Sequence, residues 1–378
     1  MSYAKELPVT ASEPVSTAAR ELTSGLEIQD EVVRRRIRRE GIVGLGETYE
    51  EGAWSVDRLD DLMYRVFTSP PPRLSPFVWT KLLLTALDQR VLNRQAGRGA
   101  FKIGTKHYDL GNDLFRCMLD ESMTYTCGYW ADAKTLDEAQ EAKLDLVCRK
   151  LDLQPHQHVL DIGCGWGNFA RHAARNYGAR VTGLTVSREQ ADLARARCEG
   201  LPVEIRLQDY REIDEVFDHV VSIEMIEAVG RRNLPTFFRV VDRSLKEGGL
   251  FVLQVIYGNT LTRTSDRRLD QFILWLLKCI FPDGYLPRSD ELVPPRDTDL
   301  RIEDWQRYFD DYERTLLAWA SRFNDGWDGI ADQYDENFRR RWNFYLHGCA
   351  AAFRARLVDV GQIVYARGGS TRRVDPKR

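Results

Sequence analysis

Three glycines at alternate positions, preceded by an aspartate, form the pattern in this sequence with the most evident chemical use. They are Gly163, Gly165 and Gly167 in VLDIGCGWGNFA (159–170), and the acid is Asp161. Glycine permits a tight turn and lets backbone N–H groups approach a ligand closely. A G-x-G pair alone is weak evidence, because many tight turns contain one. The pattern predicts a ligand-binding turn between a strand and a helix.

The spacing distinguishes two kinds of nucleotide ligand. A dinucleotide-binding turn has the pattern G-x-G-x-x-G, which places a pyrophosphate at a helix N-terminus, and an acid on the next strand for the ribose. Here the third glycine comes one position earlier, and the next strand ends in Thr185 and Ser187. Asp161 would meet a positive group rather than a phosphate. A ligand with an ammonium and a sulfonium and no phosphate fits, so we predict S-adenosylmethionine.

Further contacts to this donor are predicted at the ends of the following strands. Asp209 in LQDYR (207–211) could accept a hydrogen bond from an adenine amino group, with Gln208 beside it, although taken alone Asp209 would be a solvated loop acid. Ser187 and Gln190 form an S-x-x-Q capping box at a helix start. Thr185, Ser187 and Gln190 are predicted to contact the donor.

The elements that must position these residues follow from short β-branched runs. From about residue 155 the runs HVLDIG, RVTGLTV, VEIRLQD, HVVSIE and LFVLQVI alternate with helical stretches. Strands that alternate with helices of about 10–15 residues indicate βαβ units and a parallel sheet. The sequence therefore predicts an α/β fold.

The first part of the chain has a different pattern. Residues 1–25 are polar and predicted to be mobile. A helix is predicted through IQDEVVRRRIRREG up to Gly41, then a loop or short hairpin over 44–54 and a helix from Val56 to about Phe67.

A linker is predicted at TSPPPRLSP (68–76), because three consecutive prolines exclude a continuous helix. We therefore predict a helical N-terminal domain over 26–90 and a second domain over 91–378.

The composition argues against several classes of protein: nucleic-acid-binding proteins, disulfide or metal scaffolds and membrane-spanning proteins. The formal net charge is −3, which argues against attraction of the whole protein to nucleic acid. Seven scattered cysteines with no C-x-x-C pair predict neither a disulfide framework nor a metal site, and they favour a cytoplasmic protein. The most apolar window, FILWLLKCIF (272–281), is shorter than the roughly 20 residues that span a bilayer.

At this point a family resemblance can be stated. The chain resembles the cyclopropane fatty-acyl-phospholipid synthases from GLGETYEEGAWSVDRLD (44–60) to QIVYARG (362–368). The motifs that carry the resemblance are HYDLGNDLF (107–115), MTYTCGYW (123–130), LDIGCGWG (160–167), GLTVSREQ (183–190), LQDYR (207–211), SIEMIEAVG (222–230), IFPDGYLP (280–287) and YERTLLAW (312–319). It implies a seven-stranded, Rossmann-like class I methyltransferase core with a helical active-site insertion at about 257–345.

The resemblance also implies a reaction. An alkene in a phospholipid acyl chain attacks the methyl group of S-adenosylmethionine, and loss of a proton from the new methyl closes a three-membered ring. The chemistry needs a water-poor cavity, aromatic faces that tolerate a cation, and a base. In the family the base is a bound bicarbonate, and its site matches these residues of this chain: Cys127, Glu227, Ile256, Tyr312 and Gln254.

Two positions depart from the family pattern. Ala228 replaces a histidine in SIEMIEAVG, and Gln254 replaces the histidine of the anion site. A glutamine still donates a hydrogen bond but carries no charge, so bicarbonate binding is less secure than methyl transfer. The resemblance further assigns Tyr108 in HYDLGNDLF, and Tyr125 and Thr126 in MTYTCGYW, to donor binding.

The substrate implies contact with a membrane that nothing in the sequence spans. LDQFILWLLKCIFPDGYLP (269–287) could line an acyl tunnel, lie at the interface, or form a core helix. The run RRRIRR (34–39), with further cations at Arg90, Arg94, Arg98, Lys102 and Lys106, could steer the enzyme to anionic lipid, although charge runs are more often solvated faces. We also predict that the protein associates transiently with the inner face of the membrane, and a homodimer is possible.

Three alternatives remain open at this stage. Deprotonation elsewhere on the cation would give a methyl-branched or methylene fatty acid instead of a ring. A small-molecule methyltransferase could share the core. Outside the enzymes, an inactive lipid-binding module could keep the fold.

Overall fold

The computed structural model describes residues 28, 30–70, 74–91, 111–258 and 266–368. Its helices are α2 (Glu31–Glu40), α3 (Ile42–Glu50), α4 (Leu59–Thr68), α5 (Pro76–Val91), α7 (Asn112–Met118), α8 (Leu136–Lys150), α9 (Asn168–Tyr177), α10 (Arg188–Arg197), α11 (Leu234–Ser244), α12 (Arg267–Cys279), α13 (Phe309–Asp325) and α14 (Glu336–Arg354). Short 3-10 helices are η1 (Tyr210–Glu212), η2 (Ile226–Ala228), η3 (Arg231–Asn233), η4 (Ser289–Leu292) and η5 (Trp327–Gly329).

The strands form one mixed sheet within the described residues. They are β1 (His158–Ile162), β2 (Arg180–Thr185), β3 (Val203–Leu207), β4 (Phe217–Ile223), β5 (Leu245–Gly258), β6 (Leu300–Arg307) and β7 (Val358–Arg367). Their order is β3-β2-β1-β4-β5-β7-β6. β1 to β5 pair in parallel, as predicted, whereas β7 runs antiparallel to β5 and β6. The α/β, Rossmann-like class I fold is confirmed.

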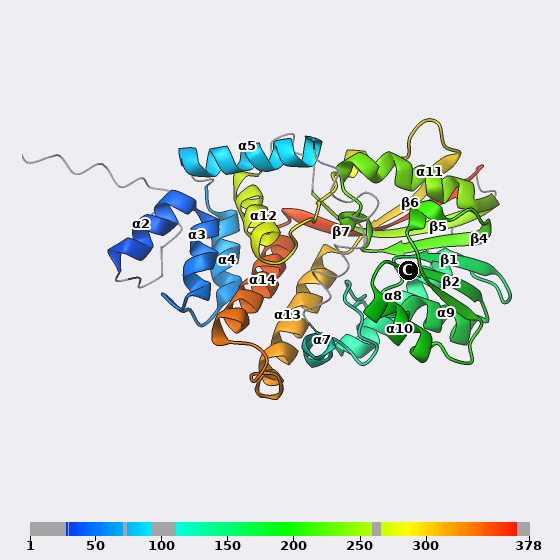
Figure 1. Cartoon of the computed structure of the whole chain (residues 1–378), viewed down its shortest axis with the longest axis horizontal. Helices are drawn as coiled ribbons and strands as arrows, with labels where there is room; N and C mark the ends of the chain where they lie inside the picture. Colours follow the sequence, from blue (N-terminus) through cyan, green and yellow to red (C-terminus); the bar gives the residue numbers. More distant parts are fainter. Residues whose placement is uncertain (1–27, 29, 71–73, 92–110, 259–265, 369–378) are drawn as a thin grey trace, which may run out of the picture.

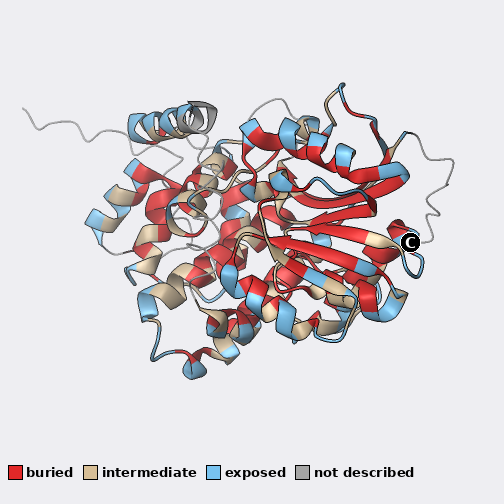
Figure 2. Ribbon diagram, turned by 45° about the vertical axis from the view of Figure 1, so that its right-hand side comes forward, coloured by how far each residue is buried: buried red, intermediate tan, exposed pale blue. Residues whose placement is uncertain are grey.

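Alternating side chains of the central strands face two separate cores. Val159, Val181 and Val221 pack on one face with α8 and α9, whereas Leu160 and Val220 pack on the other with α11. The central strands are buried on both faces (Figure 2), as expected for a sheet covered by helices on both sides, whereas the edge strands β3 and β6 are partly exposed.

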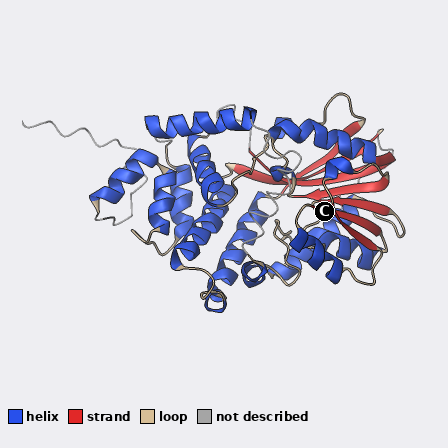
Figure 3. Ribbon diagram, in the orientation of Figure 1, coloured by secondary structure: helices blue, strands red, loops and turns tan. Residues whose placement is uncertain are grey.

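The other half of the molecule is helical (Figures 1 and 3). Helices α2, α3 and α4 share one hydrophobic core with α12, α13 and α14, although nearly 200 residues separate the two groups in the sequence. The helices of the predicted insertion therefore join the N-terminal helices to the sheet. The boundary at residue 90 stays a prediction, because residues 92–110 lie outside the described residues.

The prediction of a loop or hairpin over 44–54 was wrong for most of its length. Residues 42–50 form α3, which packs against α12 and α14. A Cβ at Gly46 would lie 2.5 Å from the indole nitrogen of Trp275 and 2.8 Å from Phe344. Gly46 is thus a site of close helix packing, and tertiary contact overrides the low helix propensity of glycine. The two helices predicted on either side agree better with the structure. Gly41 is the C-cap of α2, and α4 lies at Leu59–Thr68, where a helix from Val56 to about Phe67 was predicted.

Candidate functional site

The glycine turn connects β1 to α9 as predicted. The N–H groups of Gly163 and Cys164 both donate to the carbonyl of Leu184 in β2, at 3.0 and 2.9 Å. Gly163 has a φ of +85°, and a Cβ there would lie 2.4 Å from the side chain of Met225. A side chain would therefore be strained and would also clash, so this position requires glycine.

A cavity of about 200 Å³, here called the donor cavity, opens beside this turn. Of the residues predicted to bind the donor, ten line it: Tyr125, Thr126, Asp161, Gly163, Gly165, Thr185, Ser187, Gln190, Gln208 and Asp209. Tyr108 lies outside the described residues. Gly167 does not line the cavity. It is the N-cap of α9 with a φ of +82°, and a Cβ there would lie 3.1 Å from Ala194, so this glycine serves helix packing.

Asp161 presents an uncompensated acceptor to the donor cavity. The side chain is 2% exposed, and its Oδ2 atom has no hydrogen-bond partner in the described residues. Burial raises the pKa of Asp161 to about 7, and the charge of nearby Lys143 opposes that rise. A cationic group in the cavity would supply the missing partner, which agrees with the ammonium group expected of the donor.

The polar residues at the ends of β2 and β3 are held by one another. Ser187 caps α10 by accepting from the N–H of Gln190 at 3.3 Å. The second half of the predicted capping box, a bond from the Ser187 N–H to the Gln190 side chain, is absent. The side-chain oxygen of Gln190 accepts from the Thr185 hydroxyl instead, at 2.9 Å. Asp209 does not lie free in a loop, since it accepts from Nε of Arg211 at 2.8 Å.

A second cavity of about 730 Å³, here called the acyl cavity, lies among the helices. Its walls are mainly apolar side chains of α5, α12, α13 and α14, among them Leu83, Phe272, Leu276, Leu316 and Phe353. The window 269–287 was predicted to line an acyl tunnel, lie at the interface or form a core helix. Its helix α12 lines this cavity with Phe272, and Phe272 and Trp275 are buried in the core.

The two cavities meet at three residues that line both, Tyr125, Glu224 and Ala228. The Tyr125 hydroxyl lies 2.7 Å from that of Tyr345 on α14. The Tyr125 ring also packs 5.1 Å from Trp319, measured between centroids. A group held in the donor cavity would face the acyl cavity through this opening, which is walled by aromatic faces and a carboxylate.

The five predicted catalytic residues come together near this junction, around the carboxylates of Glu224 and Glu227. The Glu224 carboxylate accepts from three of them: the backbone N–H of Cys127 at 2.9 Å, the side-chain amide of Gln254 at 2.7 Å and the hydroxyl of Tyr312 at 2.6 Å. The backbone N–H of Ile256 donates instead to Glu227, at 2.6 Å.

Two buried carboxylates therefore lie close together, with different surroundings. Burial and the charge of Glu224 raise the pKa of Glu227 to about 8. Burial also raises the pKa of Glu224, but hydrogen bonds from Tyr312, Gln254 and Cys127 and the charge of Lys143 oppose the rise. Lys143 is itself buried and donates to the Thr126 hydroxyl at 2.7 Å, and burial lowers its pKa to about 8.

Cys127 contributes through its backbone. The thiol is 2% exposed and lies 3.3 Å from the carbonyl of Gly128. Burial, with the charges of Glu224 and Asp311, raises the pKa of the Cys127 thiol well above its usual range. A neutral buried thiol is no nucleophile.

Sequence reasoning missed Glu224, Lys143 and Gln362. Glu224 lies inside a motif that was singled out, three residues before Glu227. Gln362 of β7 donates to the side-chain oxygen of Gln254 at 2.9 Å. These contacts cross the sheet or join distant segments, so no local pattern signals them.

Three features outside the two cavities were also considered in the sequence: metal clusters, membrane-spanning helices and runs of basic residues. In the described ranges no cluster of three or more His, Cys, Asp or Glu side chains could hold a metal ion. Among those residues, too, we find no helix with both the length and the apolar character needed to cross a membrane. The run at 34–39 is largely paired with acids, Arg36 with Glu47 and Glu51 and Arg39 with Glu40. The basic side chains from Arg90 to Lys106 lie outside the described part.

Comparison with known proteins adds independent findings. The family description "Mycolic acid cyclopropane synthetase" matches residues 96–363. The chain is 44% identical over 334 residues to the cyclopropane-fatty-acyl-phospholipid synthase of Escherichia coli K12, covering 88% of this chain and 85% of the relative. It is 35% identical over 356 residues to the tuberculostearic acid methyltransferase UfaA1 of Mycobacterium tuberculosis, covering 90% and 82%.

Among solved structures, the chain is similar to the mycolic acid cyclopropane synthase CmaA1, crystallised in complex with SAH and CTAB. The TM-score is 0.64 at 32% identity, over 71% of this chain and 98% of that one. CmaA1 therefore covers a smaller share of this chain, 71%, than the Escherichia coli enzyme does, 88%.

Proposed function

Because the chain belongs to the mycolic acid cyclopropane synthetase family, we propose that it converts the cis double bonds of unsaturated phospholipid acyl chains into cyclopropane rings. The chain is an S-adenosylmethionine-dependent methyltransferase, and acyl chains are the substrates of its relatives by name. The phospholipid form of the substrate is favoured by 44% identity, over 88% of the chain, to an enzyme whose name specifies a phospholipid.

The observation that carries the proposal is the meeting of the two cavities at Tyr125, Glu224 and Ala228. The donor cavity fits S-adenosylmethionine, because Asp161 has a buried oxygen with no partner in the described residues and the glycine turn admits no side chain. When bound, this donor supplies an electrophilic methyl group on a sulfonium. The acyl cavity has a volume of about 730 Å³ and mainly apolar walls, which suits a hydrocarbon chain.

The residues around the junction suit a reaction that passes through a cation. Tyr125, Tyr312 and Phe353 line the acyl cavity, and the rings of Tyr312 and Phe353 lie 4.6 Å apart. Aromatic faces stabilise a nearby positive charge electrostatically. The apolar walls exclude water, which would otherwise capture the cation.

A bound bicarbonate, implied by the family resemblance, does not fit the donors as they are arranged. The N–H of Cys127, the amide of Gln254 and the hydroxyl of Tyr312 already bind Glu224. The N–H of Ile256 already binds Glu227. An added anion at the same donors would also lie against the carboxylates of Glu224 and Glu227. The donors as arranged therefore leave no place for bicarbonate.

A lipid surface is the proposed place of action, and α5 supports it. Trp79, Leu83, Leu84 and Leu87 are 47–59% exposed on this helix, which extends along the top of the helical half in Figure 1. Trp79 and Leu83 also line the acyl cavity. An exposed apolar helix at the rim of an acyl cavity suits insertion into the headgroup region, from which a chain could enter. Anionic-lipid preference and a homodimer stay predictions.

A methyl-branched or methylene product remains the alternative, because the tuberculostearic acid methyltransferase is 35% identical over 90% of the chain. One experiment tests the function and the product together. Vesicles of an oleoyl phospholipid are incubated with methyl-labelled S-adenosylmethionine, and the fatty acids are analysed before and after mild hydrogenation. A labelled product that resists hydrogenation and has the mass of a ring supports the proposal. Release of S-adenosylhomocysteine without labelled lipid, or no release, contradicts it.

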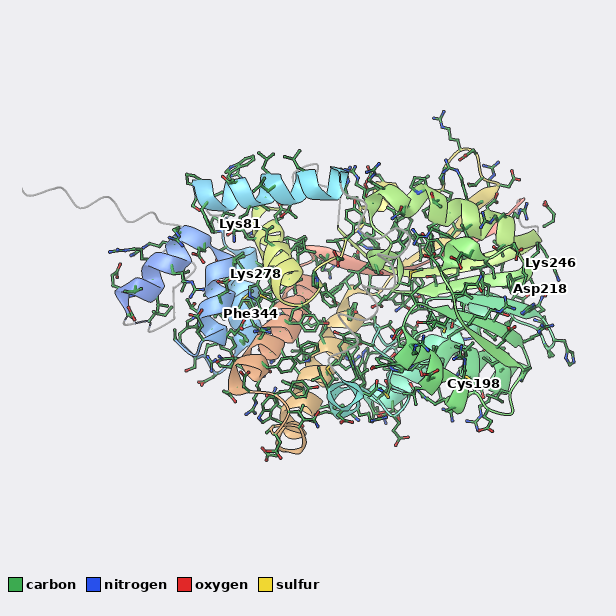
Figure 4. All side chains as sticks on the ribbon, viewed as in Figure 1. Lys81, Cys198, Asp218, Lys246, Lys278 and Phe344 are labelled. Carbon is green, nitrogen blue, oxygen red and sulfur yellow. The ribbon has the colours of Figure 1, made fainter. Side chains whose placement is uncertain are left out.

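The role of α5 is tested with a matched pair of variants. Leu84→Glu places a charge on the exposed face of α5, and Val216→Glu places one at an equally exposed apolar residue before β4. Val216 comes two residues before Asp218, which lies with Lys246 at the opposite end of the molecule from Lys81 of α5 (Figure 4). Vesicle binding and activity should fall at least tenfold for Leu84→Glu alone. Equal behaviour of the two variants would refute a membrane role for α5.

A further inference from the structure

Glu224 occupies the position at which the resemblance places an exchangeable anion. Its Oε1 atom accepts from the N–H of Cys127 at 2.9 Å and from the amide of Gln254 at 2.7 Å. Its Oε2 atom accepts from the Tyr312 hydroxyl at 2.6 Å. Three donors from three separate segments thus converge on one carboxylate supplied by the chain.

The backbone at Glu224 is held in an unfavourable conformation. Its φ is +50°, in the left-handed region, which costs a non-glycine residue about 1–2 kcal/mol. The Glu224 N–H donates to the carbonyl of Gln254 at 2.8 Å, which fixes the residue at the end of β4. Strain of this kind persists where surrounding contacts over-determine it, and it is concentrated at functional sites.

A hydrogen bond from Gln362 orients the side-chain amide of Gln254, which faces Glu224. The Gln254 side-chain oxygen accepts from Gln362, its partner across β5 and β7, at 2.9 Å. That bond turns the Gln254 nitrogen toward the carboxylate, where it donates to Glu224 and also, at 3.3 Å, to the carbonyl of Cys127. Gln362 is therefore a positioning residue.

The location of Glu224 matches the place where a proton must be removed. It is one of three residues that line both cavities, and the other two, Tyr125 and Ala228, carry no carboxylate. The bond from Tyr312 is the one hydrogen bond that the structure gives Oε2, so this oxygen retains a lone pair.

Glu227 is less suited to the task. Of the two cavities it lines the acyl cavity only, and its carboxylate accepts one hydrogen bond from another residue, the N–H of Ile256. Its pKa is raised to about 8, by burial and by the charge of Glu224, so at neutral pH it is mostly protonated. The three bonds to Glu224 favour the charged form there. The two carboxyl groups therefore differ in their surroundings, because three donors hold the oxygens of Glu224 and one donor holds those of Glu227.

We propose that the carboxylate of Glu224 is the built-in base of the reaction, in place of an exchangeable anion. The inference rests on the proposed function. The π electrons of the alkene form a bond to the methyl carbon as the sulfur–carbon bond breaks, leaving a neutral thioether and a cation at the second alkene carbon. Oε2 of Glu224 removes a proton from the transferred methyl, and the released C–H electron pair closes the ring. Glu224 then returns the proton to water.

The test measures ring formation on oleoyl phospholipid vesicles in carbon dioxide-depleted buffer, with and without added bicarbonate. Wild-type protein should form rings at the same rate in both. Glu224→Gln keeps the size of the side chain and should lower the rate of ring formation about 10²- to 10⁴-fold, the usual contribution of a general base. Glu199→Gln, which changes an exposed carboxylate after α10, should match the wild type.

A second variant uses the left-handed backbone. Glu224→Gly relieves the strain and opens the space of the carboxylate, so formate, acetate or bicarbonate should restore ring formation to Glu224→Gly but not to Glu224→Gln. S-adenosylhomocysteine binding by each variant shows that the donor cavity is intact. A role that is merely structural would not give rescue by small carboxylates.

Two results would overturn the proposal: wild-type activity that depends on added bicarbonate, or ring formation by Glu224→Gln near the wild-type rate. Failure of the proposed function looks different, because the wild-type protein itself would then form no ring under any condition.

Discussion

Ionisation of Asp161 should control donor affinity near neutral pH. With a pKa of about 7, this carboxyl is about nine-tenths protonated near pH 6 and about one-tenth protonated near pH 8. If only the carboxylate pairs with the ammonium of the ligand, affinity falls about tenfold from pH 8 to pH 6, equivalent to ~1.4 kcal/mol. Titration calorimetry with S-adenosylhomocysteine over this range measures the change.

The variant Asp161→Asn separates this effect from that of Lys143, which gains charge over the same range because its pKa is about 8. The added positive charge on Lys143 at low pH also disfavours a cationic ligand. The affinity of the wild type should therefore change with pH more steeply than that of the variant, and the difference is the contribution of Asp161. The variant should bind at least tenfold more weakly at pH 8. A wild-type affinity that does not change with pH, or a variant that keeps both the affinity and the slope, would refute this account of the donor cavity.

The same variant should stabilise the ligand-free fold, which controls for misfolding. A carboxyl whose pKa is higher in the folded than in the unfolded protein lowers stability as pH rises between the two values. For Asp161 this loss begins near pH 4, the ordinary pKa of an aspartate in an unfolded chain, and is complete above about pH 7. Asp161→Asn should therefore unfold at a higher temperature than the wild type at pH 8, with a smaller difference at pH 5.

Three further substitutions test other parts of the structure. Gly163→Ala should weaken donor binding at least tenfold, because its Cβ would lie 2.4 Å from a methionine side chain at a φ of +85°; calorimetry measures this. Gly46→Ala should lower the free energy of unfolding by about 1–3 kcal/mol in urea, because its Cβ would lie 2.5 Å from Trp275, with donor affinity unchanged. Gln362→Leu should lower kcat with little change in KM by freeing the amide of Gln254, whereas Gln362→Glu, which keeps an acceptor but loses the donor, should not restore it.

The donor cavity could be predicted from sequence because it is built from local pieces. A strand, a glycine turn and a helix follow one another in the chain, and the pattern D-x-G-x-G-x-G specifies both the turn and the charge of its ligand. Ten of the predicted donor-binding residues line one cavity. Gly167 belongs to the same pattern but does not line this cavity, and a Cβ there would lie 3.1 Å from Ala194, so its contact with the donor stays a prediction.

The N-terminal helices show the opposite case. Residues 44–54 contain three glycines and read locally as a loop, yet most of them form α3 because Gly46 lets this helix approach Trp275 and Phe344. These partners lie more than 200 residues away in the chain. Local propensity contributes about 1 kcal/mol at a glycine, which the burial of such aromatic side chains readily exceeds.

By itself, the sequence determined the α/β core, the donor and the family, because strand–turn–helix patterns and motif residues are neighbours along the chain. Only the tertiary structure decided how the reaction centre is composed. The three groups that bind Glu224 stand 97, 30 and 88 residues from it, and the motifs that contain them do not indicate that they bind this carboxylate. Hydrogen-bond geometry depends on distances in space, and the packing of β5 and α13 brings these donors to a single carboxylate.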